Sequence, residues 1–150
     1  MPNLFQGFSE WTPLTNIEDV PNTQVVYVIR VVGIDKKPIS INRARASDNN
    51  GILNIGSGKG RSRLKKLRSS FTSMKTRKDW NRWKHHQLVL WILKFEFAEL
   101  LKLQSINADN IEYRWAEAPD PKSARKLEKE TIIKYKHTYA DIPIGNLKSW

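Results

Sequence analysis

Residues 24–32 read QVVYVIRVV, and residues 51–56 read GILNIG. The first stretch is rich in β-branched and aromatic residues with few polar breaks, which is typical of a central strand covered on both faces. The second is a short apolar run, and we predict another strand there. Residues 33–50 contain a proline and an Asn-Asn pair, and this composition indicates an inserted excursion between the two strands.

A basic segment follows the second predicted strand. Residues 57–60 read Ser-Gly-Lys-Gly, and their two glycines predict a tight turn. From Arg61 onward, Leu64, Leu67 and Phe71 recur at helical spacing, with cations on the other faces. We therefore predict a short amphipathic basic helix directly after the turn.

The second half of the chain indicates a further strand and two helices. Residues 80–103 are apolar almost all round, which favours a buried helix, with a strand as the alternative for the middle. Residues 107–110 indicate a turn, and residues 111–116 alternate in the manner of a third strand. We expect a single α+β domain over residues 1–150, with residues 1–22 as an N-terminal extension packed on it.

The last helix has the clearest ends. Asp120 is a favourable N-cap, and Pro121 suits the first helical position. The apolar spacing that follows predicts a helix that ends near Tyr139.

The chain is strongly basic. It has 150 residues with 26 Lys and Arg against 15 Asp and Glu, a formal net charge of +11. Between Lys59 and Lys84 there are eleven Lys or Arg and one acid, Asp79, so most of the excess lies in this stretch. Such clustering is typical of a surface that binds phosphates, and a solvated helix face is the alternative.

Composition also excludes several classes of site. The chain has no cysteine, which excludes thiol nucleophiles, thiolate zinc sites and disulfide scaffolds. This usage fits a reducing compartment, and we expect a cytoplasmic protein. We expect neither a signal peptide nor a transmembrane helix, because no stretch approaches about 18 uncharged apolar residues.

One carboxylate is placed where carboxylates are rare. Helical spacing puts Glu128 in the apolar stripe formed by Ala124, Leu127 and Ile132. Unpaired burial would cost several kcal/mol or force protonation. A cation must therefore face Glu128: a metal ion, Arg63 or a lysine of the basic segment. A buried structural ion pair is the alternative interpretation.

Taken together, residues 23–146 resemble the GIY-YIG nuclease superfamily. Val25-Val26-Tyr27 resembles the first family motif, and Asn54-Ile55-Gly56 resembles the second. Residues 57–64 are similar to the glycine-containing turn and the Arg-Leu helix of the family, with Arg63 in the place of its arginine.

The resemblance continues to the C-terminal part of the chain. Residues 124–135, ARKLEKETIIKY, resemble the last family helix, which would make Glu128 the metal-binding carboxylate. Asn146, in the sequence IPIGN, resembles an asparagine near the family's C-terminus. Asn54 stands where the family has a tyrosine, and Leu67 stands where many members have a histidine. A relative that binds nucleic acid without catalysis is therefore an alternative.

The resemblance implies a small three-stranded antiparallel sheet flanked by helices, and phosphodiester hydrolysis supported by one divalent cation. Glu128 would hold Mg²⁺ or Mn²⁺, and Arg63 would stabilise the pentacovalent transition state. Tyr27 would position or deprotonate the attacking water, with Asn54 and Asn146 as further polar residues of the site. We also expect a nearby lysine such as Lys59 to lower the pKa of Tyr27.

The predicted function is thus a metal-dependent DNA endonuclease. The cations expected to contact nucleic acid are Lys59, Arg61, Lys65, Lys66 and Arg68. Two alternatives stay open: a catalytically degenerate nucleic-acid-binding protein of this type, and a basic module that assembles on RNA or on a protein partner.

Overall fold

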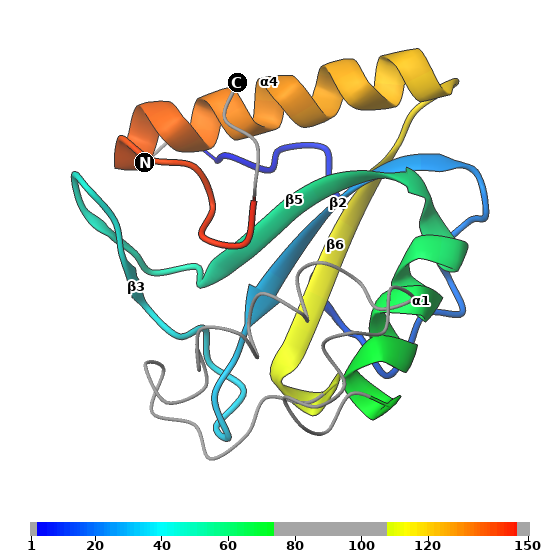
Figure 1. Cartoon of the computed structure of the whole chain (residues 1–150), viewed down its shortest axis with the longest axis horizontal. Coiled ribbons are helices and arrows are strands. Elements are labelled where there is room, and N and C mark those ends of the chain that lie inside the picture. The colour runs from blue at the N-terminus through cyan, green and yellow to red at the C-terminus, as the bar shows by residue number, and fades with distance from the viewer. Residues whose placement is uncertain (1–2, 74–107, 147–150) are drawn as a thin grey trace.

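The fold is an α+β arrangement in which one sheet lies between two helices (Figure 1). The computed structural model describes residues 3–73 and 108–146. The predicted helix over residues 80–103 lies outside the described residues. None of the described helices is both long and apolar enough to cross a membrane.

The main sheet is antiparallel. Its strands follow one another in the order β1 (Thr12–Pro13), β6 (Ile111–Glu117), β2 (Gln24–Val31) and β5 (Ile52–Lys59). Strand β2 pairs along its length with both β5 and β6, which confirms the predicted central strand. The expectation of three strands is wrong, because Thr12 and Pro13 add a short fourth strand beside β6. A two-residue strand that contains proline gives no strand pattern in the sequence, and proline is tolerated at such a sheet edge.

The tight turn predicted at residues 57–60 is also wrong. Strand β5 continues through Lys59, with Ser57 paired to Val26, and helix α1 (Gly60–Ser73) begins at the next residue. The helix begins directly after the strand, and the residues just before β2 accept hydrogen bonds from its first N–H groups. The amide of Gly60 donates to the carbonyl of Thr23 at 3.0 Å, and the amide of Arg61 donates to that of Pro21 at 3.2 Å.

Helix α4 (Pro121–Tyr139) confirms the predicted final helix at both ends. The Asp120 carboxylate accepts a hydrogen bond of 2.7 Å from the amide of Ser123. At the other end Ala140 adopts the left-handed conformation, with a φ of 56°, and its amide donates to the carbonyl of Lys136.

The core has two layers, one on each face of the sheet. Helix α4 covers one face and α1 covers the other (Figure 1). Alternation along β2 supplies both layers, with Val26 and Val28 in the α4 layer and Tyr27 and Ile29 in the α1 layer. This is why β2 is a continuous hydrophobic run.

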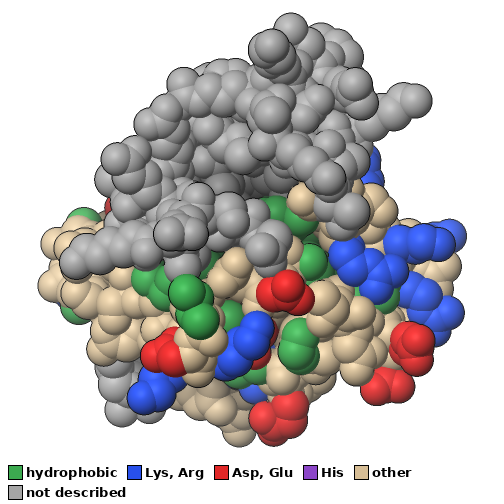
Figure 2. Space-filling view, turned by 90° about the horizontal axis from the view of Figure 1, so that it is seen from below, with side chains coloured by type: hydrophobic (Ala, Val, Ile, Leu, Met, Phe, Trp, Pro, Cys, Tyr) green, Lys and Arg blue, Asp and Glu red, His purple; other side chains and the backbone are tan. Residues whose placement is uncertain are grey.

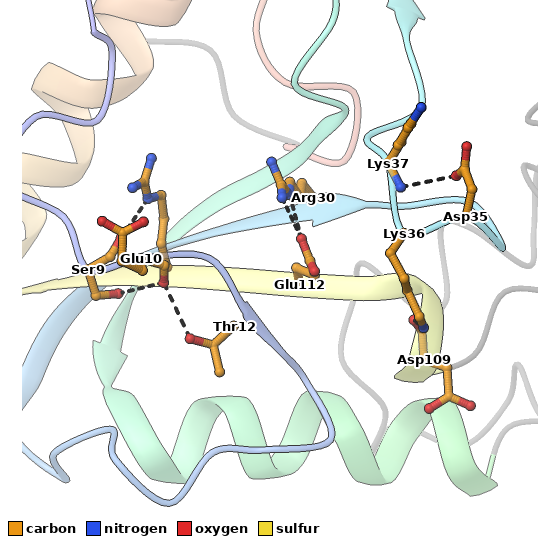
Figure 3. A network of polar contacts seen from close by, with 10 residues as sticks. Ser9, Glu10, Thr12, Arg30, Asp35, Lys36, Lys37, Asp109 and Glu112 are labelled. Carbon is orange, nitrogen blue, oxygen red and sulfur yellow. Dashed lines mark hydrogen bonds and ion pairs between the residues drawn. The ribbon is translucent and has the colours of Figure 1, made fainter.

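The N-terminal segment packs on both layers. Phe5 belongs to the α4 layer, whereas the side chains in the α1 layer are Leu14, Ile17 and Val20. Polar contacts add to this packing. The guanidinium of Arg30 binds Glu112 of the neighbouring strand (Figure 3). It also lies 4.1 Å from the ring centroid of Trp11. The segment therefore spans the sheet from one face to the other.

The excursion between β2 and β5 forms a small hairpin of strands β3 (Ile41–Asn42) and β4 (Ser47–Asp48). It is fastened to the C-terminal end of α4. The amide of Arg45 donates to the carbonyl of Tyr139 at 3.0 Å, and the hydroxyl of Tyr135 donates to the buried carboxylate of Asp48 at 2.7 Å. The C-terminal half of α4 therefore lies near the start of β5, and its N-terminal half lies near the end of β5, at Ser57.

Candidate functional site

The site begins with a tyrosine that lies against a glycine. Tyr27 of β2 stands opposite Gly56 of β5. A Cβ atom at position 56 would lie 2.5 Å from the Tyr27 hydroxyl oxygen, so the phenol lies directly against the backbone of β5. Tyr27 is only 5% exposed. Glycine is required here because any side chain would occupy the space of the hydroxyl group.

The arginine of the first α1 turn lies against a second glycine of the same strand. A Cβ atom at position 58 would lie 2.6 Å from the Nε of Arg63. Gly58 also has a φ of +149°, which residues with side chains rarely adopt. Arg63 itself is exposed, so its side chain turns back from the helix toward the end of β5 while it stays open to solvent.

The carboxylate of the site comes from α4. Glu128 is half-buried, and its Oε2 accepts a hydrogen bond of 2.5 Å from the hydroxyl of Ser57. Within the described part of the chain, no ion pair joins Glu128 to a cation. The carboxylate is thus fixed by a neutral donor, and its charge is not cancelled by a partner in direct contact.

The ionisation of Tyr27 links these three side chains. Burial raises the pKa of Tyr27 to about 12, against the lowering effect of Arg63 and with a further raising effect of Glu128. The charges of Arg63 and Glu128 therefore both act on the Tyr27 hydroxyl. The expectation that a lysine such as Lys59 lowers this pKa is wrong: the cation that lowers it is Arg63, and burial outweighs that effect. At neutral pH Tyr27 is a protonated phenol that can donate a hydrogen bond.

A basic hollow adjoins this group. It has a volume of about 720 Å³ and lies between the end of β5, the start of α1 and the start of α4. Ser57, which holds Glu128, is in its wall. The charged side chains that line it are all cations: Lys59, Arg63, Lys66 and Arg125. The hollow can therefore receive an anion next to the Glu128 carboxylate.

The five cations predicted to contact nucleic acid have different surroundings. Lys59 and Lys66 line the hollow. Lys65 is exposed outside the wall of the hollow. The guanidinium of Arg61 donates to the carbonyl of Val20 at 3.1 Å, and that of Arg68 donates to the carbonyl of Thr15 at 3.3 Å. These last two hold the N-terminal segment on α1. Figure 2 shows Lys and Arg side chains grouped at the right of the view, with Asp and Glu side chains next to them.

Asn54 and Asn146 meet each other at the edge of β5. The side chain of Asn146 accepts from the amide of Ile55 at 3.0 Å and donates to the carbonyl of Ile55 at 2.9 Å. The Nδ2 of Asn54 lies 3.4 Å from the Oδ1 of Asn146 and 3.5 Å from the carbonyl of Gly145. Their contacts attach the C-terminal segment to β5. Asn54 is two residues before Gly56, the glycine that contacts Tyr27.

Sequence reasoning missed two residues of this region. Ser57 was assigned to a turn, although its place directly after Gly56 in a continuing strand would turn its side chain toward α4. Arg125 lies three residues before Glu128, a helical spacing that puts both side chains on neighbouring parts of α4. The basic hollow thus draws on α4 as well as on the basic segment.

Glu128 is the residue that could hold a metal ion. No group of three or more metal-ligating side chains occurs among residues 3–73 and 108–146. Mg²⁺ is commonly bound through one or two carboxylates together with substrate phosphates and water. A single carboxylate beside a basic hollow fits that mode of binding, with the phosphate supplying further ligands.

Comparisons with known proteins gave no match. No family model, no curated protein and no solved structure matches the chain.

Proposed function

We propose that the protein is a metal-dependent endonuclease that hydrolyses phosphodiester bonds in DNA, with a site of the GIY-YIG type. One observation carries the proposal. Tyr27, Arg63 and Glu128 come from three different elements, and the charges of the last two act on the hydroxyl of the first, beside a hollow lined by cations. A phenol, a guanidinium and a carboxylate in one place form a set suited to phosphoryl transfer.

The hollow receives the phosphate. Lys59 and Lys66 attract the anion, while the guanidinium of Arg63 can bind two phosphate oxygens at once. Charge on these oxygens grows as water attacks phosphorus, so a fixed guanidinium stabilises the transition state more than the ground state. The contact of Arg63 with Gly58 holds the side chain toward the hollow before substrate binds.

Tyr27 orients the attacking water. Its raised pKa keeps the phenol protonated at neutral pH, so positioning is the role that we propose rather than proton abstraction. The close contact with Gly56 fixes the hydroxyl in one place.

Glu128 would hold Mg²⁺ or Mn²⁺, with the Ser57 hydroxyl fixing one carboxylate oxygen. When bound, the ion neutralises charge on the scissile phosphate and on the leaving oxygen.

Matched pairs of variants test this proposal. Purified protein is incubated with supercoiled and linear DNA and Mg²⁺ or Mn²⁺. Arg63→Ala and Glu128→Gln should each lose cleavage by about 100-fold or more. Lys134→Ala and Glu130→Gln on α4, both exposed, should cleave as the wild-type protein does. Equal loss in a control and its partner, or cleavage that survives both site variants, would contradict the assignment.

A second function is favoured by the surroundings of Asn54. An amide cannot deprotonate water, and the side chain of Asn54 lies against Asn146 and Gly145, while Tyr27 is a protonated phenol at neutral pH. A protein that binds nucleic acid without cleaving it fits this observation. Salt-dependent DNA binding by a wild-type protein that cuts no substrate under any metal condition would establish this second function.

A further inference from the structure

Helix α4 carries a row of cations on its outer side. Lys122, Arg125, Lys126 and Lys129 are all exposed, and we name these four residues the basic ridge. Their spacings of three and four residues place them on one side of the helix. The side of α4 that faces the sheet is buried in the core through Ala124, Thr131, Ile132, Tyr135 and Tyr139.

The basic ridge is continuous with the hollow. Arg125 belongs to both, because it is a member of the ridge and lines the hollow together with Lys59 and Lys66. Asp120, the acidic residue just before α4, is the N-cap of this helix and accepts a hydrogen bond from the amide of Ser123. Cations therefore extend from the hollow on to the outer surface of α4.

We propose that the basic ridge binds the backbone phosphates of double-stranded DNA that flank the cleaved bond. The inference rests on the proposed function, since it assigns the flanking part of the same substrate. From Lys122 to Lys129 the helix rises about 10 Å. Duplex DNA carries one negative charge per about 1.7 Å of its axis, so the ridge spans several phosphates.

The chemistry of α4 favours a nucleic acid over a lipid surface. Helices that bind membranes insert an apolar face between lipid headgroups. The apolar face of α4 is buried against the sheet, and the ridge itself consists of four charged side chains. Ionic contact with a phosphate backbone needs no apolar insertion.

The test measures DNA binding in the presence of EDTA, so that no cleavage is required. The triple variant Lys122→Gln, Arg125→Gln and Lys126→Gln is compared with a control triple variant, Lys36→Gln, Lys37→Gln and Lys134→Gln. All six positions are exposed, and the two variants lose the same charge. Binding of a fluorescent duplex is followed by anisotropy between 50 and 200 mM salt, and thermal unfolding shows that both variants fold.

The salt dependence gives the decisive number. Each phosphate contact contributes about 0.9 to the slope of log affinity against log salt, so three lost contacts lower the slope by about 2.7. Between 50 and 200 mM salt the affinity of both proteins falls. The factor by which it falls should be about 40 times smaller for the ridge variant than for the wild type. The control variant should keep the slope of the wild type.

Three results would overturn the inference: an unchanged slope in the ridge variant, an equal fall in both variants, or a preference for anionic vesicles or for RNA over duplex DNA. These outcomes are separate from failure of the proposed function. A protein that binds DNA through the ridge but never cuts it refutes the nuclease and retains the ridge. A protein that cuts DNA with an unchanged slope in the ridge variant refutes the ridge alone.

Discussion

Two glycines shape the candidate site by leaving one side of β5 without side chains. Gly56 and Gly58 alternate along the strand, and Tyr27 and Arg63 occupy the space where their Cβ atoms would stand. The sequence predicts a strand that ends at Gly56 and a tight turn that includes Gly58. Their role in the structure is close approach, which depends on side chains contributed by β2 and α1 and is not encoded in the local sequence.

Ser57 carries the first prediction at the residue scale. Ser57→Ala removes the donor that fixes Glu128 at 2.5 Å, so the carboxylate loses its orientation. If Glu128 holds the metal, the Mg²⁺ concentration for half-maximal cleavage should rise by about 10- to 100-fold, as for other groups that orient a metal ligand. Calorimetric titration of Mn²⁺ without DNA gives a second measure of the same change.

Ser57→Thr is the matched control, since it keeps the hydroxyl group and should bind metal nearly as the wild type does. An alanine variant with unchanged metal dependence would show that Ser57 does not orient Glu128 for metal binding.

At the scale of elements, the predictions that succeeded rest on local signals. Helix α4 has its N-cap at Asp120 and ends at Tyr139, because caps and apolar spacing are set by neighbouring residues. The turn predicted at residues 57–60 failed because pairing with residues 24–26 decides how far β5 extends. Strand β1 depends in the same way on β6, about a hundred residues away in the sequence.

The edge of β5 carries the prediction at this scale. The amide of Gly145 donates to the carbonyl of Leu53 at 2.6 Å, and the Asn146 side chain binds both polar groups of the buried residue Ile55. Asn146→Ala leaves these groups without their partners and should lower the free energy of unfolding by about 1–3 kcal/mol. Urea denaturation measures the change.

Asn146→Asp retains the acceptor for the Ile55 amide but sets a carboxylate oxygen against the Ile55 carbonyl, so it should not restore the stability of the wild type. An alanine variant that unfolds at the same urea concentration as the wild type would show that the contact adds nothing to stability.

At the scale of the whole molecule, helical spacing singled out Glu128, whereas the family resemblance marked Arg63 as a site residue. The sequence did not predict that Ser57 rather than a cation would contact Glu128, or that Arg125 would join the hollow, because both depend on how α4 lies against the sheet. It also failed on the pKa of Tyr27, because the depth of burial follows from the packing of the whole domain.

The four tyrosines give a prediction for the whole fold. Burial raises the pKa of Tyr27 and of Tyr113 to about 12, and the pKa values of Tyr135 and Tyr139 are also raised. A tyrosine with a higher pKa in the folded state stabilises the fold fully below pH 10, and this contribution is lost as the pH rises toward 12. Tyr27 alone accounts for about 3 kcal/mol over that interval.

Stability measured by chemical denaturation should therefore fall steeply between about pH 10 and pH 12. Phenolate absorbance should appear above pH 10 and together with the loss of structure. A Tyr27→Phe variant should show a shallower fall, and tyrosines that ionise near pH 10 in a fully folded protein would contradict the assignment.

Both flanks of the main sheet are covered by segments from the two ends of the described chain. Residues 9–13 lie along β6, and residues 145–146 bind β5. An uncovered flank would offer a row of amides and carbonyls to another copy of the chain. At these positions another chain could add a strand only after the two segments had been displaced.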